Sequence, residues 1–112
     1  MKLITAVIKP TRLETVSTAL ADAGFSGLTA TEVQGRGAQG GRTEYYRGQA
    51  VEVTFRTKIR IELLVTDEDL DRALEVLVEA ARSGTIGDGK VWVTDVGHVV
   101  RVRTGEVGPA AV

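Results

Sequence analysis

Apolar and polar residues alternate most clearly over residues 58–65 of the chain, which is typical of a strand with one buried face. Charged residues at positions 58, 60 and 62 would face the other way. Shorter apolar runs predict strands over residues 3–8, 28–33 and 91–96, with a further short one over 99–103. The apolar side of the clearest strand comprises Ile59, Ile61, Leu63 and Val65.

Two segments instead repeat apolar residues every three or four positions, which predicts amphipathic helices. The first helix would start after Pro10, where Thr11 and Glu14 fit a capping box, and end at Gly24. The second would span residues 67–82. Its apolar stripe comprises Leu70, Ala73, Leu74, Leu77 and Ala81.

The predicted order is strand, helix, strand, and then the same three elements again. This order indicates an α+β, ferredoxin-like βαββαβ fold, with an antiparallel sheet and both helices on one of its faces. The other face has to be covered or tolerably polar, and self-association is a natural way to cover it.

The connection between the two halves, about residues 34–53, is too long for an ordinary hairpin. It is rich in glycine and arginine and contains Tyr45 and Tyr46. Long loops inside compact domains are usually functional, and this composition favours a surface that contacts a partner protein.

Length and composition narrow the class of protein. A chain of 112 residues predicts a single domain, 1–112, and the absence of cysteine excludes disulfides, cysteine-based zinc sites and thiol nucleophiles. The net charge of -1 argues against a general nucleic-acid binder. No stretch reaches transmembrane length, so we expect a cytoplasmic protein.

The candidate chemistry lies near the end of the chain, in Gly87-Asp-Gly-Lys90. Its glycines would expose backbone N–H groups and its lysine supplies a point charge. Arg101 and Arg103 would project from the same face of an extended segment. Each half alone is compatible with a glycine-rich turn and a solvated strand edge. Together they favour a nucleotide sensor that holds polyphosphate without reacting with it.

The main alternative from another class is a small phosphotransferase. It would need a base, and the chain's one histidine, His98, is more in keeping with the end of a strand. Asp88 and Asp95 could serve, but Asp88 between two glycines is typical of a turn. We therefore expect no catalysis. An RNA-binding domain is disfavoured because the few aromatic residues are scattered.

With these features in hand, the chain resembles the nitrogen-regulatory PII signal-transduction family over essentially its whole length. Several long motifs match in register, which is far more specific than the glycine-rich run alone. These motifs cover residues 1–10, 31–35, 43–48, 58–62, 86–93 and 102–106.

The resemblance implies a homotrimer with a nucleotide cleft at each subunit boundary, where ATP and ADP compete. It implies that 2-oxoglutarate binds beside an Mg²⁺ ion held by ATP. It also implies that the long loop, the T-loop of the family at about 36–54, acts on a target such as an ammonium transporter, another membrane transporter or a metabolic enzyme.

The resemblance also assigns roles to particular positions. On the phosphate side these are Gly87, Asp88, Gly89, Lys90, Arg101 and Arg103. At the base and ribose they are Thr29, Glu62 and Leu64, and at the loop base Gly35 and Gly37. For 2-oxoglutarate they are Gln39, Gly41 and Lys58, with Gln39 also on the metal. From the residues alone, Lys58 could equally be a solvated strand lysine, and Glu62 could pair with Lys58 or Arg60.

The chain departs from the family's pattern in the loop. Val51 stands where many members carry a modifiable tyrosine, and Gln49 where some carry a phosphorylated serine, which excludes both modifications at these positions. Ala38 and Gly40 replace the usual arginine and lysine, which would weaken discrimination of ATP from ADP or AMP. Two functions therefore stay open within the family: nitrogen regulation with 2-oxoglutarate as co-effector, or a divergent nucleotide sensor without that response for a non-nitrogen transporter or enzyme.

Overall fold

A computed structural model of the chain describes residues 1–37, 42–46, 48–53 and 55–112, and only the backbone within 42–46 and 49–53. Its main sheet has the strand order β2-β5-β1-β6, and every neighbouring pair is antiparallel. This arrangement confirms the predicted α+β, ferredoxin-like fold. The strands are β1 (Lys2–Ile8), β2 (Thr29–Gly35), β5 (Arg56–Val65) and β6 (Lys90–Asp95).

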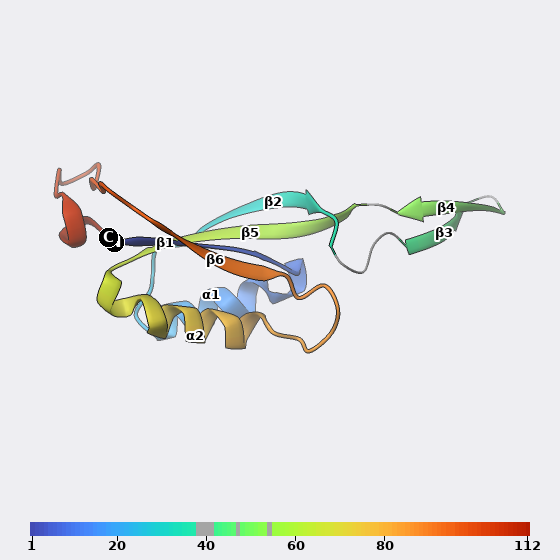
Figure 1. Cartoon of the computed structure of the whole chain (residues 1–112), viewed down its shortest axis with the longest axis horizontal. Coiled ribbons are helices and arrows are strands. Elements are labelled where there is room, and N and C mark those ends of the chain that lie inside the picture. Colours follow the sequence, from blue (N-terminus) through green and yellow to red (C-terminus); the bar gives the residue numbers. More distant parts are fainter. Residues whose placement is uncertain (38–41, 47, 54) are drawn as a thin grey trace.

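Both helices, α1 (Leu13–Asp22) and α2 (Leu70–Ala81), cover the same face of this sheet (Figure 1). The four apolar positions predicted for β5 are all buried beneath them, which confirms the alternation. The stripe of α2 is buried at its centre, where Ala73 and Leu77 are inaccessible to solvent. The core is completed by residues of β1 and α1, chiefly Ile4, Ala6, Ile8, Val16 and Leu20.

The entry into the first helix differs from the prediction. Thr11 lies inside a short 3-10 helix, η1 (Pro10–Arg12), and α1 then begins without a side-chain cap, so the predicted capping box is wrong. Proline explains the difference because its fixed φ favours the first helical position and tightens the turn immediately after β1. The predicted end is confirmed: Gly24 has φ +97° just beyond α1. A second 3-10 helix, η2 (Asp67–Asp69), precedes α2.

The long connection between β2 and β5 contains secondary structure that we did not predict. Strands β3 (Arg42–Tyr46) and β4 (Gln49–Val53) pair as an antiparallel hairpin, with Tyr46 opposite Gln49. Gly48, with φ +77°, lies in the turn between them. In Figure 1 the hairpin lies beyond the end of the main sheet, past the end of β2 and the start of β5.

The predicted strand over residues 99–103 is absent from the described part of the chain. A single bridge joins Val100 to Val107 around a turn, and a 3-10 helix, η3 (Gly108–Ala111), follows. The chain reverses because Gly105 adopts φ +72° and its N–H donates to the Arg101 carbonyl at 2.8 Å. The two arginines therefore do not share one face of an extended segment, and that prediction is wrong.

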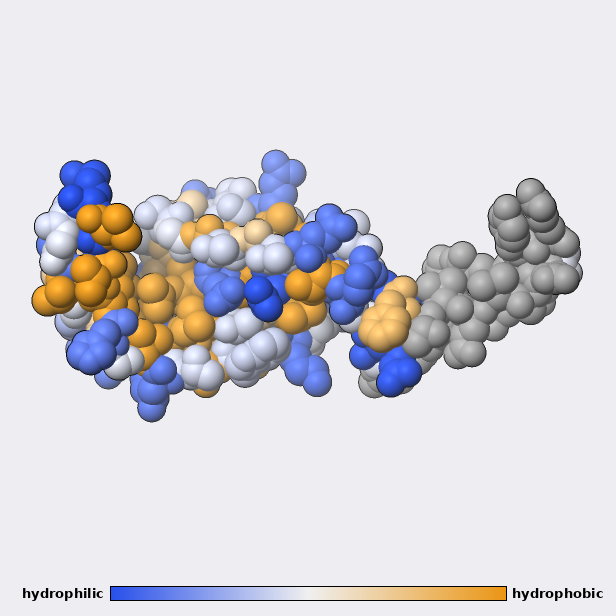
Figure 2. Space-filling model, turned by 90° about the horizontal axis from the view of Figure 1, so that it is seen from above, coloured by the Kyte–Doolittle hydropathy of each residue, from blue (hydrophilic) through white to orange (hydrophobic). Residues whose placement is uncertain are grey.

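The face of the sheet opposite the helices is open (Figure 2). It mixes charged residues of β5 with apolar ones, among which Trp92 keeps 43% of its surface exposed and Leu64 37%. Apolar residues gather toward the end of the molecule where the C-terminal segment lies. Among the described residues, no helix has the length and apolar character needed to cross a bilayer.

Candidate functional site

The glycine-rich run lies on the loop from α2 to β6, which is built against β1. Gly89 has φ +89°, and a Cβ added to it would lie 1.7 Å from the carbonyl oxygen of Val7. Gly87 also has a positive φ, +93°. Position 89 therefore admits only glycine, because any side chain would both strain the backbone and collide with a neighbouring strand.

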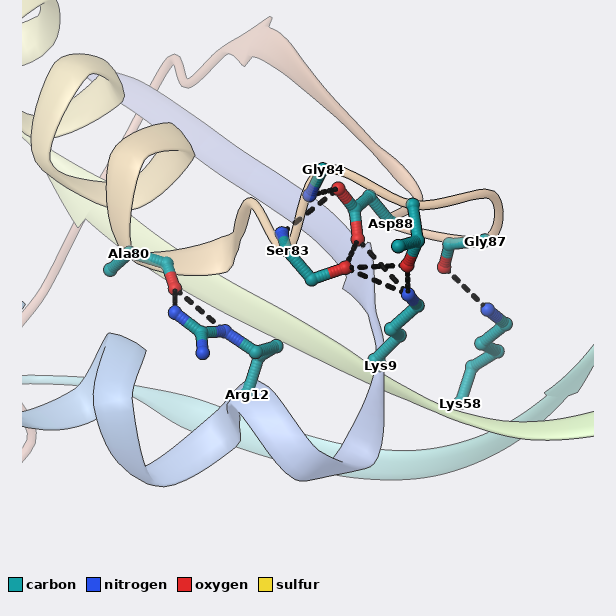
Figure 3. A network of polar contacts seen from close by, with 9 residues as sticks. Lys9, Arg12, Lys58, Ala80, Ser83, Gly84, Gly87 and Asp88 are labelled. Carbon is teal, nitrogen blue, oxygen red and sulfur yellow. Dashed lines mark hydrogen bonds and ion pairs between the residues drawn. The ribbon is translucent and has the colours of Figure 1, made fainter.

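The carboxylate of Asp88 folds this loop back on itself (Figure 3). One of its oxygens accepts the backbone N–H groups of Ser83 and Gly84, each at 2.9 Å. The other accepts the Ser83 hydroxyl and faces the Lys9 ammonium at 3.2 Å. The Ser83 hydroxyl above all, with the two N–H groups and Lys9, holds the pKa of Asp88 well below its usual range. The predicted role of Asp88 as a turn former is confirmed, and such a carboxylate is a poor base.

This pKa shift predicts a pH dependence of stability. A carboxyl whose folded pKa lies below its unfolded value of about 4 stabilises the protein above that pH and loses the effect on acidification. We expect Asp88→Asn to lower the free energy of unfolding at pH 7, and the difference from the parent to shrink as the pH falls toward 3. Urea unfolding across this range measures it, with Asp22→Asn as control. A difference that stays constant with pH would contradict the shift.

Lys58, on β5, approaches the loop from the sheet. Its Nζ donates to the Gly87 carbonyl at 2.7 Å, and its side chain passes Gly35, whose added Cβ would lie 3.5 Å from Lys58 Cγ. Burial, and then the positive charges of Lys9 and Arg56, lower the pKa of Lys58. Lys58 is thus not a freely solvated strand lysine, and an anionic ligand at its ammonium would relieve the repulsion.

Two basic residues without an assigned role in the predicted site, Lys9 and Arg12, organise this end of the molecule. Lys9 lies at the end of β1, with its Nζ 2.8 Å from Ser83 Oγ and 2.5 Å from Thr85 Oγ1. Nearby, Arg12 donates two hydrogen bonds, of 3.1 and 2.6 Å, to the Ala80 carbonyl at the end of α2. The only signal in the sequence was the position of Lys9, immediately after a buried strand and before a proline.

Lys90 is the first residue of β6 and borders a small cavity. This cavity has a volume of about 320 Å³ and a mainly apolar lining. It lies between the end of α2 and the edge strand. Its walls comprise Ile8, Val78, Ala81, Arg82, Asp88, Gly89, Lys90 and Val91.

A larger cavity, of about 710 Å³, lies at the other end of the sheet. Thr29 and Glu62, which are register partners on β2 and β5, contribute to its wall together with Leu64 and Arg101. Arg101 Nη1 also contacts Glu106 Oε1 at 3.1 Å. Arg60 Nε lies 3.6 Å from Glu62 Oε1, so the ion pair left open for Glu62 is present alongside its place in the cavity wall.

The candidate residues thus fall into two groups. The first, the phosphate end, comprises Gly35, Lys58 and Gly87 to Lys90. The second, the cavity end, comprises Thr29, Glu62, Leu64 and Arg101. Lys58 and Leu64 are six residues apart on the same face of β5, which corresponds to roughly 20 Å. Within one copy of the chain, the two groups therefore lie at opposite ends of the sheet and do not form a single pocket.

Comparison with known proteins decides the family. The family model described as nitrogen regulatory protein P-II matches residues 1–106. The chain belongs to the nitrogen regulatory protein P-II family. It is 48% identical to the nitrogen regulatory protein P-II of Pasteurella multocida over the full length of both. It is 50% identical to P-II 2 of Methanothermobacter thermautotrophicus, covering 97% of that protein, and 47% identical to P-II 1 of Escherichia coli.

Membership in the P-II family confirms the predicted resemblance and gives the protein a signalling role in nitrogen regulation. The family consists of regulatory proteins and not of enzymes, so the phosphotransferase alternative falls away. Of the residues predicted for this P-II protein, Gln39, Gly41, Ala38 and Gly40 lie outside the described residues, as does the side chain of Val51. Gly37 and Arg103 are exposed, and Arg103 is not part of the large cavity's wall.

Proposed function

We propose that this P-II protein binds ATP and ADP as a homotrimer and holds each nucleotide between two neighbouring copies. The observation that carries the proposal is the separation of the phosphate end from the cavity end along one sheet. A second copy that presents its cavity end to the first copy's phosphate end completes one site. Such a head-to-tail contact, repeated by rotation, closes a ring; the number three comes from the family resemblance.

The chemistry of the two ends supports this pairing. Lys58, Lys90 and the positive-φ glycines suit the phosphates, because cations and closely approaching backbone amides both favour anions. Leu64 and the cavity beside it offer an apolar wall for a base, and Glu62 a hydrogen-bond acceptor for a ribose or an amino group. Arg101 would add charge from the second copy.

The open sheet face supports the assembly. Trp92 and Leu64 stand partly exposed among polar groups there, on the face that the helices leave uncovered. Packing these faces together in a ring would bury them, as the sequence patterns predicted.

We extend the proposal to 2-oxoglutarate as co-effector, with Lys58 as its principal partner. The Lys58 side chain is partly buried, and Lys9 and Arg56 repel its ammonium, so a carboxylate would suit it better than the Gly87 carbonyl does. A Mg²⁺ ion bound with the nucleotide would supply positive charge that favours the binding of both anionic ligands. Gln39 would offer an oxygen to that ion; in the described ranges, no group of three or more His, Cys, Asp or Glu residues is placed to hold a metal ion.

The protein would act on its target through the loop at about 36–54. We propose that its conformation, read by a protein target, carries the signal in the cytoplasm. The target would be an ammonium transporter, another membrane transporter or a metabolic enzyme, with no role for nucleic acid. Val51 excludes control by uridylylation or adenylylation at that position.

A second candidate function differs in the co-effector and in the target. Ala38 replaces an arginine that in the family usually reaches toward the terminal phosphate, and Gly40 replaces a usual lysine; both departures favour a sensor of nucleotide state that does not respond to 2-oxoglutarate. Such a protein would serve a target outside nitrogen regulation.

Titration calorimetry with ATP, ADP and AMP, each with and without Mg²⁺ and 2-oxoglutarate, tests both candidates. We expect micromolar binding of ATP and ADP, and 2-oxoglutarate binding only with Mg-ATP. Lys58→Met removes a charged partner worth about 1.5 to 3 kcal/mol, so it should weaken 2-oxoglutarate binding 10- to 100-fold. Arg60→Met, on the same face of β5, serves as control.

The outcomes separate the candidates. If 2-oxoglutarate fails to bind the unmodified protein even with Mg-ATP, the second candidate replaces the first. If no adenine nucleotide binds, both are wrong.

A further inference from the structure

Lys9, which was not assigned to the nucleotide, makes three polar contacts with the glycine-rich loop. Its ammonium lies within 3.2 Å of Ser83 Oγ, Thr85 Oγ1 and Asp88 Oδ1. The side chains of Lys9 and Asp88 are only 23% and 25% exposed. Charge-assisted hydrogen bonds are stronger in such partly desolvated positions than at an open surface.

We infer that Lys9 and Asp88 are positioning residues of the nucleotide site, which lock the loop of residues 83–89 against the end of β1 before any ligand binds. This inference rests on the proposed function. Neither side chain needs to touch the nucleotide, because both act through the backbone and through Lys58 and Lys90.

The loop is held at two places on the same strand. The backbone of Gly89 packs on the Val7 carbonyl. Lys9 contacts Ser83, at the start of the loop, and also Asp88. Gly87 lies between these two anchors, with its carbonyl bonded to Lys58 (Figure 3). A loop ordered in advance loses less conformational entropy when it binds, so the lock would raise affinity without a contact of its own.

The charged residues around the loop also influence the pKa of Lys58. Lys9 and Arg56 repel the Lys58 ammonium, whereas Asp88 attracts it. Burial lowers the pKa of Lys58 most, and the charge of Lys9 adds to it, so Lys9→Met should raise the pKa of Lys58, whereas Lys9→Arg, which keeps the charge, should leave it near the parent's value.

Lys9→Met tests the lock, with Lys2→Met as its matched control. Lys2 lies at the opposite end of the same strand and pairs with Asp95 at 2.5 Å, far from the loop. We expect Lys9→Met to weaken ATP binding at least tenfold by calorimetry, and Lys2→Met to change it less than twofold. Lys9→Arg, which keeps the charge and the donors, should restore most of the affinity.

Two further measurements distinguish positioning from general damage. Adding Asp88→Asn to Lys9→Met should cost little more than the larger single effect, because coupled residues are not additive. Without any nucleotide, NMR titration of the Lys58 side chain should show a higher pKa in Lys9→Met than in the parent.

The possible results are unambiguous. Parent-like ATP binding by Lys9→Met, or an equal loss in Lys2→Met, overturns the inference. If the parent itself binds no nucleotide, the proposed function is wrong, and an unchanged Lys58 titration in Lys9→Met would then also overturn the network.

Discussion

Alanine at both Arg101 and Arg103 is expected to abolish detectable ATP binding, and so is alanine at Lys90 in a separate variant. Each charged contact to a phosphate is worth about 1.5 to 3 kcal/mol, so the double variant should lose roughly 3 to 6 kcal/mol. The surface ion pair between Arg101 and Glu106 that is lost with it contributes little to stability. Calorimetry at micromolar protein measures the loss, with Lys2→Ala as control.

Mixing these two inactive variants is expected to restore binding in part. Lys90 belongs to the phosphate end and Arg101 to the cavity end, so each variant still carries one intact end. If every site joins the ends of two neighbours, random co-assembly leaves about a quarter of the sites intact, one half multiplied by one half.

The stoichiometry of ATP bound by co-expressed, separately tagged variants measures this rescue. Mixed assemblies that bind no ATP at all, although the unmodified protein binds it well, would place each site within one copy. The shared-site proposal would then be wrong.

Gly89→Ala is expected to be the most damaging single substitution in the loop. Its φ of +89° costs an alanine about 1 to 2 kcal/mol, and the new Cβ would lie 1.7 Å from the Val7 carbonyl oxygen. Relief requires the loop to move away from β1, so the total loss of folding free energy should be about 3 to 5 kcal/mol. Nucleotide binding should fall with it, because Gly87 and Lys90 move too.

Gly84→Ala provides a matched control for this effect. Gly84 has a similar φ, +83°, on the same loop, but an added Cβ would meet nothing within 4 Å. It should cost only the backbone strain, about 1 to 2 kcal/mol. Urea unfolding of both variants separates strain from collision. Equal losses of folding free energy in the two variants would mean that the close approach of Gly89 to β1 adds nothing to the cost of the substitution.

The elements with a strong burial period were predicted from the sequence to within three residues at each end. β5 and α2 each bury one face against the same core. Their apolar residues therefore recur about every 2 and about every 3.6 positions, and this repeat is visible in the sequence. The capping box at Thr11 failed because Pro10 decides the first turn by its own geometry.

Two errors arose where a few residues override the local pattern. The apolar alternation at residues 99–103 predicts a strand, but the turn at Gly105 and the contacts of Glu106 reverse the chain. The hairpin of β3 and β4 was missed although its signal was visible, since Gly48 lies between two segments of strand-forming residues.

The candidate site was predicted only in part, for a similar reason. Motifs contiguous in sequence, such as Gly87 to Lys90, are visible as patterns. The network around Lys9 is not, because Lys9 and Ser83 are 74 residues apart and only the fold joins them. The separation of the two ends along β5 also required the sheet register, which no local pattern contains.

The environment of Lys58 has a consequence for chemical reactivity. An amine whose pKa is lowered by burial and by neighbouring cations keeps a larger fraction of its nitrogen unprotonated at neutral pH, and only that form is nucleophilic. Lys2, whose pKa Asp95 raises, is in the opposite condition. Lys58 is therefore the better nucleophile of the two toward acylating reagents, and a carboxylate bound at its ammonium would protect it.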